Sequence, residues 1–211
     1  IEAGWRTFAE AHLSVKEQIV DISEECVADK GLPEMGFTLG GLAELSDPEV
    51  RLLPAIGPDG HVHAVTSWMP VYRDGVPVGL TLDFMRRRSD GFPVAMEFLI
   101  ASAALLAQQE GLRFLSLSGA PLANADDGES DDDRGALDAL LDLLGRTLEP
   151  VYGFRSLLAF KAKFQPRYRP VYMVFPDAAA LPAIGIAIGR AYLPDLSWEE
   201  SGRLLTRRLR R

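Results

Sequence analysis

The pattern of apolar and polar residues predicts a long helix near the start of the chain. Between residues 5 and 28, apolar side chains recur three or four positions apart, as they do on one face of a helix. Lys30-Gly31 and Pro33 then end the pattern with residues that stop helices. We therefore expect a helical segment over residues 1–34 and a globular domain over residues 35–211.

Three strands are predicted in the next part of the chain. Runs rich in β-branched and aromatic residues lie at 50–56, 61–72 and 76–85. They are separated by Pro58-Asp59-Gly60 and Arg73-Asp74-Gly75, and Asp-Gly pairs favour the tight turns that join antiparallel strands. The pattern predicts a three-stranded antiparallel meander, preceded by a short strand at 37–39.

The second half of the chain alternates helical and extended patterns. Pro93 stands where a first-turn proline belongs, and an apolar helix over 94–111 ends at Gly111. The elements expected after it are a strand (113–119), two helices (136–148 and 154–164), a strand (168–175) and a helix (178–192). This order is typical of an α+β fold with a mixed sheet, an antiparallel meander and a central helix.

The composition is that of a globular chain, and the acidic residues are concentrated in one stretch. The 211 residues are 47% apolar, which is enough to bury a core. The net charge is −8, but six acidic residues fall between Asp126 and Asp133, and outside that stretch 22 basic residues face 24 acidic ones. We expect an acidic, mobile loop over 124–134, and the position of the basic residues matters more than the total charge.

Several classes of site are disfavoured. The chain contains no run of 18 or more consecutive apolar residues, the length needed to span a bilayer. It is therefore expected to be soluble. Cys26 is the only cysteine, which excludes an internal disulfide. His61 and His63 share one side of a predicted strand without a third ligand, so no metal site is expected. The chain begins with Ile1, and we expect it to be part of a longer protein.

A basic block without acidic residues lies between Pro150 and Pro176. Its five cations alternate with aromatic residues (Arg155, Lys161, Lys163, Arg167 and Arg169; Tyr152, Phe154, Phe160, Phe164, Tyr168 and Tyr172). Such a block suits an anion site, and the aromatic rings suit stacking of nucleic-acid bases. It equally fits a helix and a strand with an aromatic core and a solvated basic face.

Helical spacing describes the two lysines of this block. Lys161 falls four residues after Leu157 and three after Leu158, so it shares the apolar side of its predicted helix. Lys163 falls three residues after Phe160. A lysine at the edge of an apolar face either extends its amine into water or binds an anion.

A second candidate site begins at Asp83, where a predicted strand ends and Arg86 and Arg87 follow. The N-terminus of the next helix attracts phosphate, and a carboxylate there could accept a proton from a hydroxyl while arginines hold the phosphate. A structural salt bridge between Asp83 and an arginine is the alternative, and spacing alone favours it. Glu97, in the first turn of the helix, is explained by the helix dipole or as a ligand of a substrate amine, and the dipole is the simpler explanation.

The order of these elements resembles that of GNAT-type acyltransferases. In that fold the strands before and after the central helix splay apart around an acyl donor, and here they would be 76–85 and 113–118. Members that use acetyl-coenzyme A carry a glycine-rich pyrophosphate loop, whereas RRRSDGFPVA (86–95) has one glycine. We therefore expect no coenzyme A and no other cofactor.

Longer stretches resemble the C-terminal domain of the phosphatidylglycerol lysyltransferases, the multiple peptide resistance factor family, and its actinobacterial relatives. An Asp-x-x-Arg pattern at Asp83 and Arg86 and a Lys-x-Lys-Phe-x-Pro pattern at Lys161 and Lys163 follow the family's order. The matching stretches are MGFTLGGL (35–42), LTLDFMRRR (80–88), VAMEFLIASAALLAQQEG (94–111), LSLSGAPLA (115–123) and VYGFRSLLAFKAKFQPRYRPVYMVFP (151–176).

The resemblance implies a GNAT-like fold and transfer of lysine or alanine from aminoacyl-tRNA to the glycerol hydroxyl of phosphatidylglycerol. Together with the basic block, it leads us to expect catalytic residues (Asp83, Arg86 and Lys163) and substrate-binding residues (Arg87, Glu97, Tyr152, Arg155 and Lys161) without a metal. The expected partners are aminoacyl-tRNA and anionic phospholipid at the cytoplasmic face of the cell membrane, and a homo-oligomer is compatible with both. Transfer to a non-lipid acceptor and a non-catalytic module that binds lipid or tRNA are the alternatives.

Overall fold

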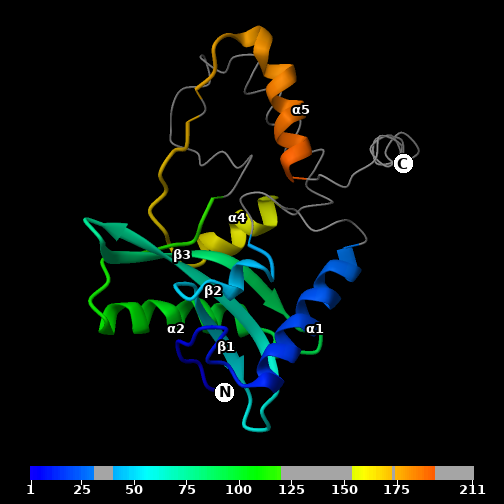
Figure 1. The fold of residues 1–211 in the computed structure, drawn as a ribbon, viewed down its shortest axis with the longest axis vertical. Helices are drawn as coiled ribbons and strands as arrows, with labels where there is room; N and C mark the ends of the chain where they lie inside the picture. The colour runs from blue at the N-terminus through cyan, green and yellow to red at the C-terminus, as the bar shows by residue number, and fades with distance from the viewer. Residues whose placement is uncertain (31–39, 120–153, 173, 193–211) are drawn as a thin grey trace. The chain divides into compact units, whose positions relative to one another are not determined.

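The structure, a computed structural model, describes residues 1–30, 40–119, 154–172 and 174–192 (Figure 1). The chain divides into two units, Ile1–Ser116 with Val174–Arg211 and Leu117–Met173. The strand predicted at 37–39, the helix predicted at 136–148 and the acidic loop at 124–134 lie outside the described residues, as does the predicted boundary after residue 34.

A mixed sheet with strand order β1-β2-β3-β4 forms the centre of the first unit. The predicted meander is confirmed: β1 (Arg51–Ile56), β2 (Val62–Arg73) and β3 (Val76–Arg87) are antiparallel. Asp74 and Gly75 join β2 to β3 with φ of 52° and 76°, the left-handed backbone that an Asp-Gly pair adopts readily. The fourth strand, β4 (Phe114–Ser116), runs parallel to β3.

The predicted central helix is α2 (Ala95–Gln109), which connects β3 to β4. Gly111 follows it at φ 74°, and the next N–H, that of Leu112, donates to the carbonyl of Ala107 at 2.9 Å. The buried face of α2 packs against β1, β2 and β3 (Leu99, Ile100 and Ala103). The order of the strands and of this crossover helix confirms the predicted α+β, GNAT-like arrangement.

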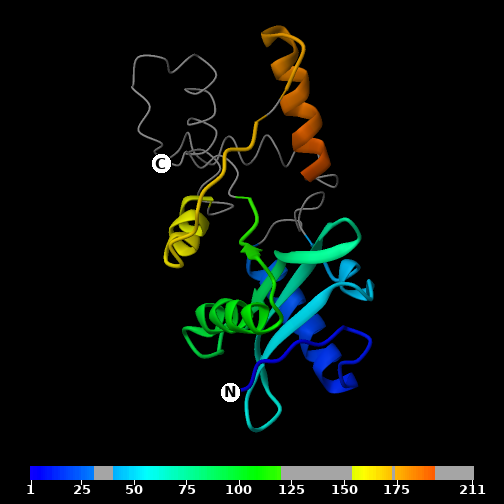
Figure 2. The same cartoon turned by 90° about the vertical axis from the view of Figure 1, so that its left-hand side faces the viewer.

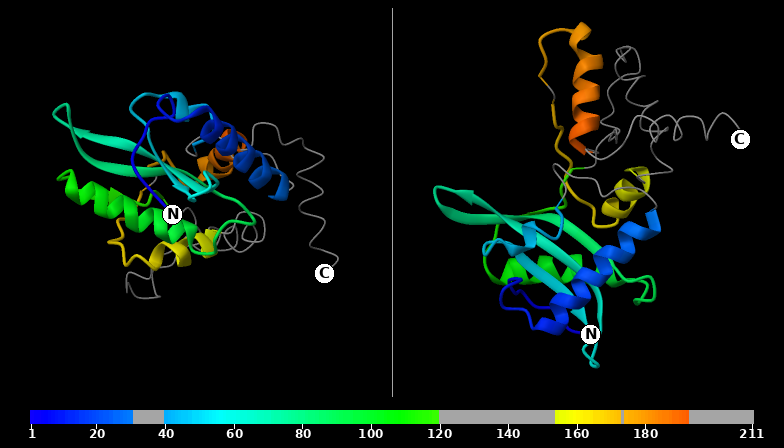
Figure 3. Two further views of the ribbon diagram at one scale, coloured as in Figure 1. Left: turned by 90° about the horizontal axis from the view of Figure 1, so that it is seen from below. Right: turned by 45° about the vertical axis from the view of Figure 1, so that its right-hand side comes forward.

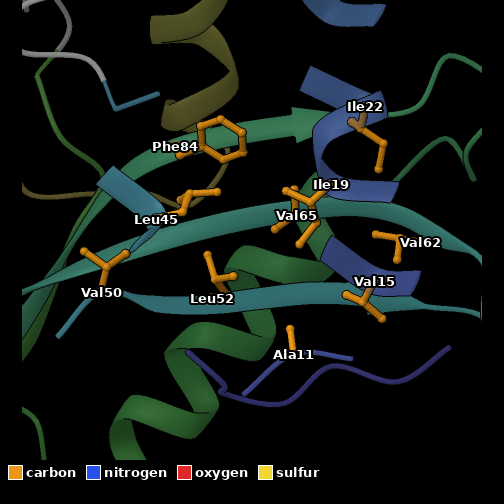
Figure 4. Close-up of a cluster of buried hydrophobic side chains, with 10 residues drawn as sticks. All are labelled: Ala11, Val15, Ile19, Ile22, Leu45, Val50, Leu52, Val62, Val65 and Phe84. Carbon is orange, nitrogen blue, oxygen red and sulfur yellow. The ribbon is translucent and has the colours of Figure 1, made fainter. Parts of the chain in front are cut away.

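Helix α1 (Leu13–Lys30) covers the face of the sheet opposite α2 (Figures 2 and 3). Its fully buried Ile19 and Ile22 pack with side chains of the sheet (Leu52, Val62, Val65 and Phe84), as Figure 4 shows. Burying an isoleucine of this kind stabilises the fold by roughly 1.5–3 kcal/mol. Helix α1 and the sheet therefore share one core.

The N-terminal helix is shorter than predicted, because the residues before Leu13 form other hydrogen bonds. Arg6 donates its N–H to the Leu52 carbonyl at 3.1 Å and accepts from the Leu52 N–H at 2.7 Å, so this segment pairs with the edge of β1. Thr7 and Glu10 then close a turn through their side chains. Pairing satisfies backbone groups that an uncovered edge strand leaves open.

The strand predicted at 168–175 is not formed, since the described residues of this range have no regular structure. Pro170 interrupts it and lacks the N–H that a sheet ladder requires. The remaining elements are close to the predictions, with 113–119 shortened to β4. The helices predicted at 154–164 and 178–192 correspond to α4 (Phe154–Ala162) and to the 3₁₀ turn η3 (Ala178–Ala180) with α5 (Leu181–Tyr192).

Candidate functional site

Asp83 lies at a β-bulge in β3. The register of β2 against β3 shifts by one residue between Thr66 and Trp68, so Ser67 of β2 faces two residues of β3, Asp83 and Phe84. Buried Ser67 accepts a hydrogen bond from the Phe84 N–H, with its Oγ 3.1 Å from that nitrogen. The serine thereby satisfies a backbone donor that the bulge removes from the ladder.

The bulge determines which face of the sheet the end of β3 presents. Phe84 packs with α1, whereas Leu82 pairs with Trp68 on the other face, although residues two apart in a regular strand share a face. Asp83 is contacted by Gly40, which precedes η1 (Glu44–Ser46). Leu45 of η1 belongs to the same cluster as Phe84, so the bulge places Phe84 beside Asp83 on the side of the sheet that α1 and η1 cover.

The Asp83 carboxylate is half-buried and is held by a backbone amide. Burial raises the pKa of Asp83, the hydrogen bond from the Gly40 N–H lowers it, the charge of Glu44 raises it, and the charge of Arg86 lowers it. Because burial is the largest of these effects, the pKa of this carboxyl lies above its ordinary value. A carboxylate with a raised pKa is a stronger base than an exposed one.

Arg86 supplies the positive charge beside Asp83. Its guanidinium lies over the Phe84 ring, 4.5 Å from the ring centroid, and it donates to the Met85 carbonyl at 3.0 Å. Phe84 is fully buried, so the ring provides a rigid support for the guanidinium. The predicted pairing of a carboxylate with an arginine at the end of this strand is therefore present as an electrostatic interaction.

The next two arginines differ from Arg86 in their surroundings. Arg87 is exposed, and its carbonyl accepts a hydrogen bond from the Cys26 thiol at 3.3 Å. Arg88 donates to the Val62 carbonyl at 3.1 Å and forms an ion pair with Glu25 of α1 at 3.4 Å. Arg88 thus connects α1 to the sheet and serves the fold.

The lysine pair consists of one buried and one exposed residue. Lys161 of α4, in the second unit, is 6% exposed, and its Nζ donates to the Gly119 carbonyl at 2.8 Å. The predicted position of Lys161 on the apolar side of its helix is confirmed. Burial lowers the pKa of Lys161 to about 8. Lys163 follows the end of α4, exposed, with its amine 5.4 Å from the centroid of the Phe160 ring.

The other predicted site residues are less informative. Glu97 lies in the first turn of α2, where the helix dipole favours a carboxylate. Arg155 lies in α4 with only its backbone described, and Tyr152 is outside the described residues.

His61 and His63 stack edge to face at 5.0 Å, and the described residues contain no group of three or more side chains suited to a metal. Among the residues that the structure describes, none of the helices has both the length and the apolar character of a membrane span.

Sequence reasoning missed three residues of the site: Ser67, Gly40 and Glu44. Gly40 stands in the stretch MGFTLGGL, but its contact with Asp83 joins segments that are far apart in the chain. Ser67 occupies a position in β2 where a small polar residue gives no local signal of a bulge. These contacts depend on tertiary structure, so no spacing rule would have found them.

Comparisons with known proteins agree with this fold. An uncharacterised protein of Corynebacterium glutamicum is 49% identical over 189 residues, which cover 90% of this chain and 23% of that protein. The phosphatidylglycerol lysyltransferase of Bacillus subtilis is 28% identical over 170 residues, 80% of this chain and 18% of the enzyme. The chain thus spans less than a quarter of the length of these curated relatives.

A solved structure and a family model also match this chain. The structure of L-PGS from Bacillus licheniformis matches 90% of this chain and 55% of its own with a TM-score of 0.70 at 21% identity, which shows a common fold. The model of the family described as "Phosphatidylglycerol lysyltransferase, C-terminal" matches residues 1–175. Since that match covers most of the 211 residues, the chain belongs to the family of phosphatidylglycerol lysyltransferase C-terminal domains.

Proposed function

We propose that this chain transfers an aminoacyl group, lysine or alanine, from aminoacyl-tRNA to a glycerol hydroxyl of phosphatidylglycerol. The main support is the Asp83 carboxylate, which is half-buried, bound by a backbone amide and adjacent to the charge of Arg86. Family membership supports lipid aminoacylation as the class of reaction. The proposed partners are aminoacyl-tRNA and phosphatidylglycerol at the cytoplasmic face of the membrane.

The reaction requires a base for the acceptor hydroxyl. The hydroxyl oxygen of the lipid attacks the ester carbonyl carbon of aminoacyl-tRNA, a new C–O bond forms, and the C–O bond to the tRNA breaks. Asp83 takes the proton from the attacking hydroxyl and returns it to the terminal oxygen of the departing tRNA. A carboxyl with a raised pKa suits both steps, because it binds the proton more strongly than an ordinary aspartate and still releases it.

Arg86 is proposed to orient the acceptor. A guanidinium binds phosphate through two parallel hydrogen bonds, and the phosphate of phosphatidylglycerol is attached to the glycerol that carries the acceptor hydroxyl. Holding that phosphate beside Asp83 would bring the hydroxyl to its base. The entropy cost of aligning the two groups would then be met on binding, which lowers the barrier of the chemical step. Exposed Arg87 is assigned to the same anion, and Glu97 to the amine of the aminoacyl group.

The lysine pair is proposed to neutralise a phosphate of the lipid or of the tRNA, with Tyr152 and Arg155 as further contacts. Lys161→Met and Lys163→Met are matched variants that distinguish the two amines. We expect the larger loss of transfer from Lys161→Met, because the amine of Lys161 is buried and held by the Gly119 carbonyl, whereas Lys163 is exposed. Equal losses, or a larger loss from Lys163→Met, would assign the main role to Lys163.

The test uses the purified protein with vesicles of phosphatidylglycerol. Labelled lysyl-tRNA or alanyl-tRNA is added, and aminoacyl-lipid is separated from free amino acid. We expect transfer by the wild type and a loss of at least about 100-fold in Asp83→Asn, which is typical of removing a general base. Asp90→Asn, an exposed aspartate in the loop between β3 and α2, is the matched control and should retain activity.

Two outcomes would overturn the proposal. Full activity of Asp83→Asn would remove Asp83 from the mechanism. Absence of aminoacyl-lipid with either tRNA would reject lipid as the acceptor, and mass spectrometry of a mixture of peptide, sterol and amine acceptors would then identify transfer elsewhere. Salt-sensitive binding of tRNA or lipid without turnover would indicate a binding module.

A further inference from the structure

Two successive glycines before η1 donate their backbone amides to two carboxylates. The N–H of Gly40 donates to Asp83, and the N–H of Gly41 donates to Oε2 of Glu44 at 2.8 Å. Gly40 is buried, and Glu44 is exposed. One of the two amides therefore binds the carboxylate that serves as the base in the proposed function, and it comes from a segment with no other assigned role.

The space at position 40 is a second observation on the same contact. A β-carbon added to Gly40 would overlap the carboxyl group of Asp83, with Oδ2 as the nearest atom. At Gly41 the nearest atom to an added β-carbon is Oε2 of Glu44 at 3.3 Å, a tight contact that a small shift of that exposed side chain relieves. Neither glycine has the left-handed φ that excludes alanine, so the two positions differ in burial and in the contact of Gly40 with Asp83.

We propose that Gly40 is a positioning residue for Asp83. Its missing side chain lets the chain approach the carboxylate, and its amide holds one carboxylate oxygen, so that the other is presented to the acceptor hydroxyl. This inference rests on the proposed function, because it assigns Gly40 to the reaction through Asp83 and not through contact with a substrate. Proton transfer demands such alignment, since base and hydroxyl must meet within about 2.6–3.2 Å.

The charges around Asp83 give this proposal a second readout. The groups that act on its titration are Glu44, Arg86 and the Gly40 amide. In Gly40→Ala the carboxylate must turn away from the amide, whose hydrogen bond lowers the pKa of Asp83. The pKa of Asp83 in the variant should therefore rise further, and the acidic limb of the pH–rate profile should move to higher pH.

The experiment compares Gly40→Ala with its matched control Gly41→Ala in the purified protein. For Gly40→Ala we expect kcat to fall about 10- to 100-fold, with KM for phosphatidylglycerol changed less than about twofold, because misplacement of the base affects the transition state more than binding. For Gly41→Ala we expect kcat within about threefold of the wild type. Full kcat in Gly40→Ala, or equal losses in the two variants, would overturn the proposal.

Double variants separate this inference from the proposed function. If Gly40 acts through Asp83, adding Gly40→Ala to Asp83→Asn should leave the residual activity unchanged, and a further loss would contradict the role. Thermal unfolding tests the contact without any activity: Gly40→Ala should lower the melting temperature, and Asp83→Ala in the same chain should restore most of the loss. An unrestored loss, or a double variant that does not fold, would overturn the contact itself.

Discussion

Replacing Lys161 with methionine should stabilise the protein at neutral pH while transfer is lost. The lysine is 6% exposed, and burial lowers its pKa from 10.5 to about 8. A shift of one pKa unit corresponds to 1.36 kcal/mol, so keeping the amine charged at pH 7 lowers the free energy of unfolding by about 3 kcal/mol. Methionine has a similar length and no charge, and it gives up the hydrogen bond to the Gly119 carbonyl, worth about 1 kcal/mol. The expected net gain is about 2 kcal/mol.

The pH dependence provides the sharper test. Between pH 8 and 10.5 the unfolded chain retains the proton that the native lysine has released, so the wild type becomes more stable as pH rises through this window. The advantage of Lys161→Met should therefore be complete at pH 7 and mostly gone at pH 10. Urea denaturation at both pH values measures it, and hydrogen exchange of the α4 amides reports the unfolding of that helix.

Lys163→Met is the control for this prediction. Lys163 is exposed and contacts the Phe160 ring, so its replacement should change the free energy of unfolding by less than about 1 kcal/mol. A methionine at 161 that destabilises the protein at pH 7, or a gain that is the same at pH 7 and pH 10, would refute the reasoning.

Three further substitutions test the surroundings of Asp83. Ser67→Ala leaves the buried Phe84 N–H without its acceptor and should cost about 1–3 kcal/mol in urea denaturation, together with a loss of transfer; a change below about 0.5 kcal/mol would contradict the role of the serine in the bulge. Asp83→Asn removes a charge that burial disfavours, so it should be more stable than the wild type at pH 7, and this gain should vanish as pH falls through the raised pKa of Asp83 towards the ordinary value of 3.8. Arg88→Gln breaks the link from β2 to Glu25 of α1 and should cost about 1–2 kcal/mol, while transfer per folded molecule stays unchanged.

The parts of the fold that local chemistry determines were predicted well. The turn at Asp74-Gly75 has the positive φ values that an Asp-Gly pair tolerates, and the strands on both sides of it follow from their own composition. The central helix was also expected, because Pro93 and Gly111 flank it, although Pro93 precedes the N-cap Val94 and does not lie in the first turn as predicted. Such signals act over a few residues and survive in any tertiary context.

The parts that depend on distant contacts were not predicted. Residues before Leu13 have helical spacing, yet Arg6 pairs with the edge of β1, where its N–H and C=O satisfy backbone groups that the edge strand would leave open. In the same way, the spacing of Asp83 and Arg86 suggested a charge pair but not the bulge beneath it. Ser67 and Gly40, which contact Phe84 and Asp83 and complete the candidate site, lie in other segments of the chain.

The extra residue at the bulge makes β3 sensitive to length more than to composition. With one residue deleted between Leu82 and Met85, Ser67 would face a single residue and Arg86 could stay opposite Val65, but either Asp83 or the Phe84 ring under Arg86 would be lost. A substitution in this stretch changes one side chain, whereas a deletion also removes the bulge that holds two neighbouring side chains of β3 opposite Ser67. Homologous chains that keep the same chemistry should therefore differ here by exchange of residues and should not contain gaps.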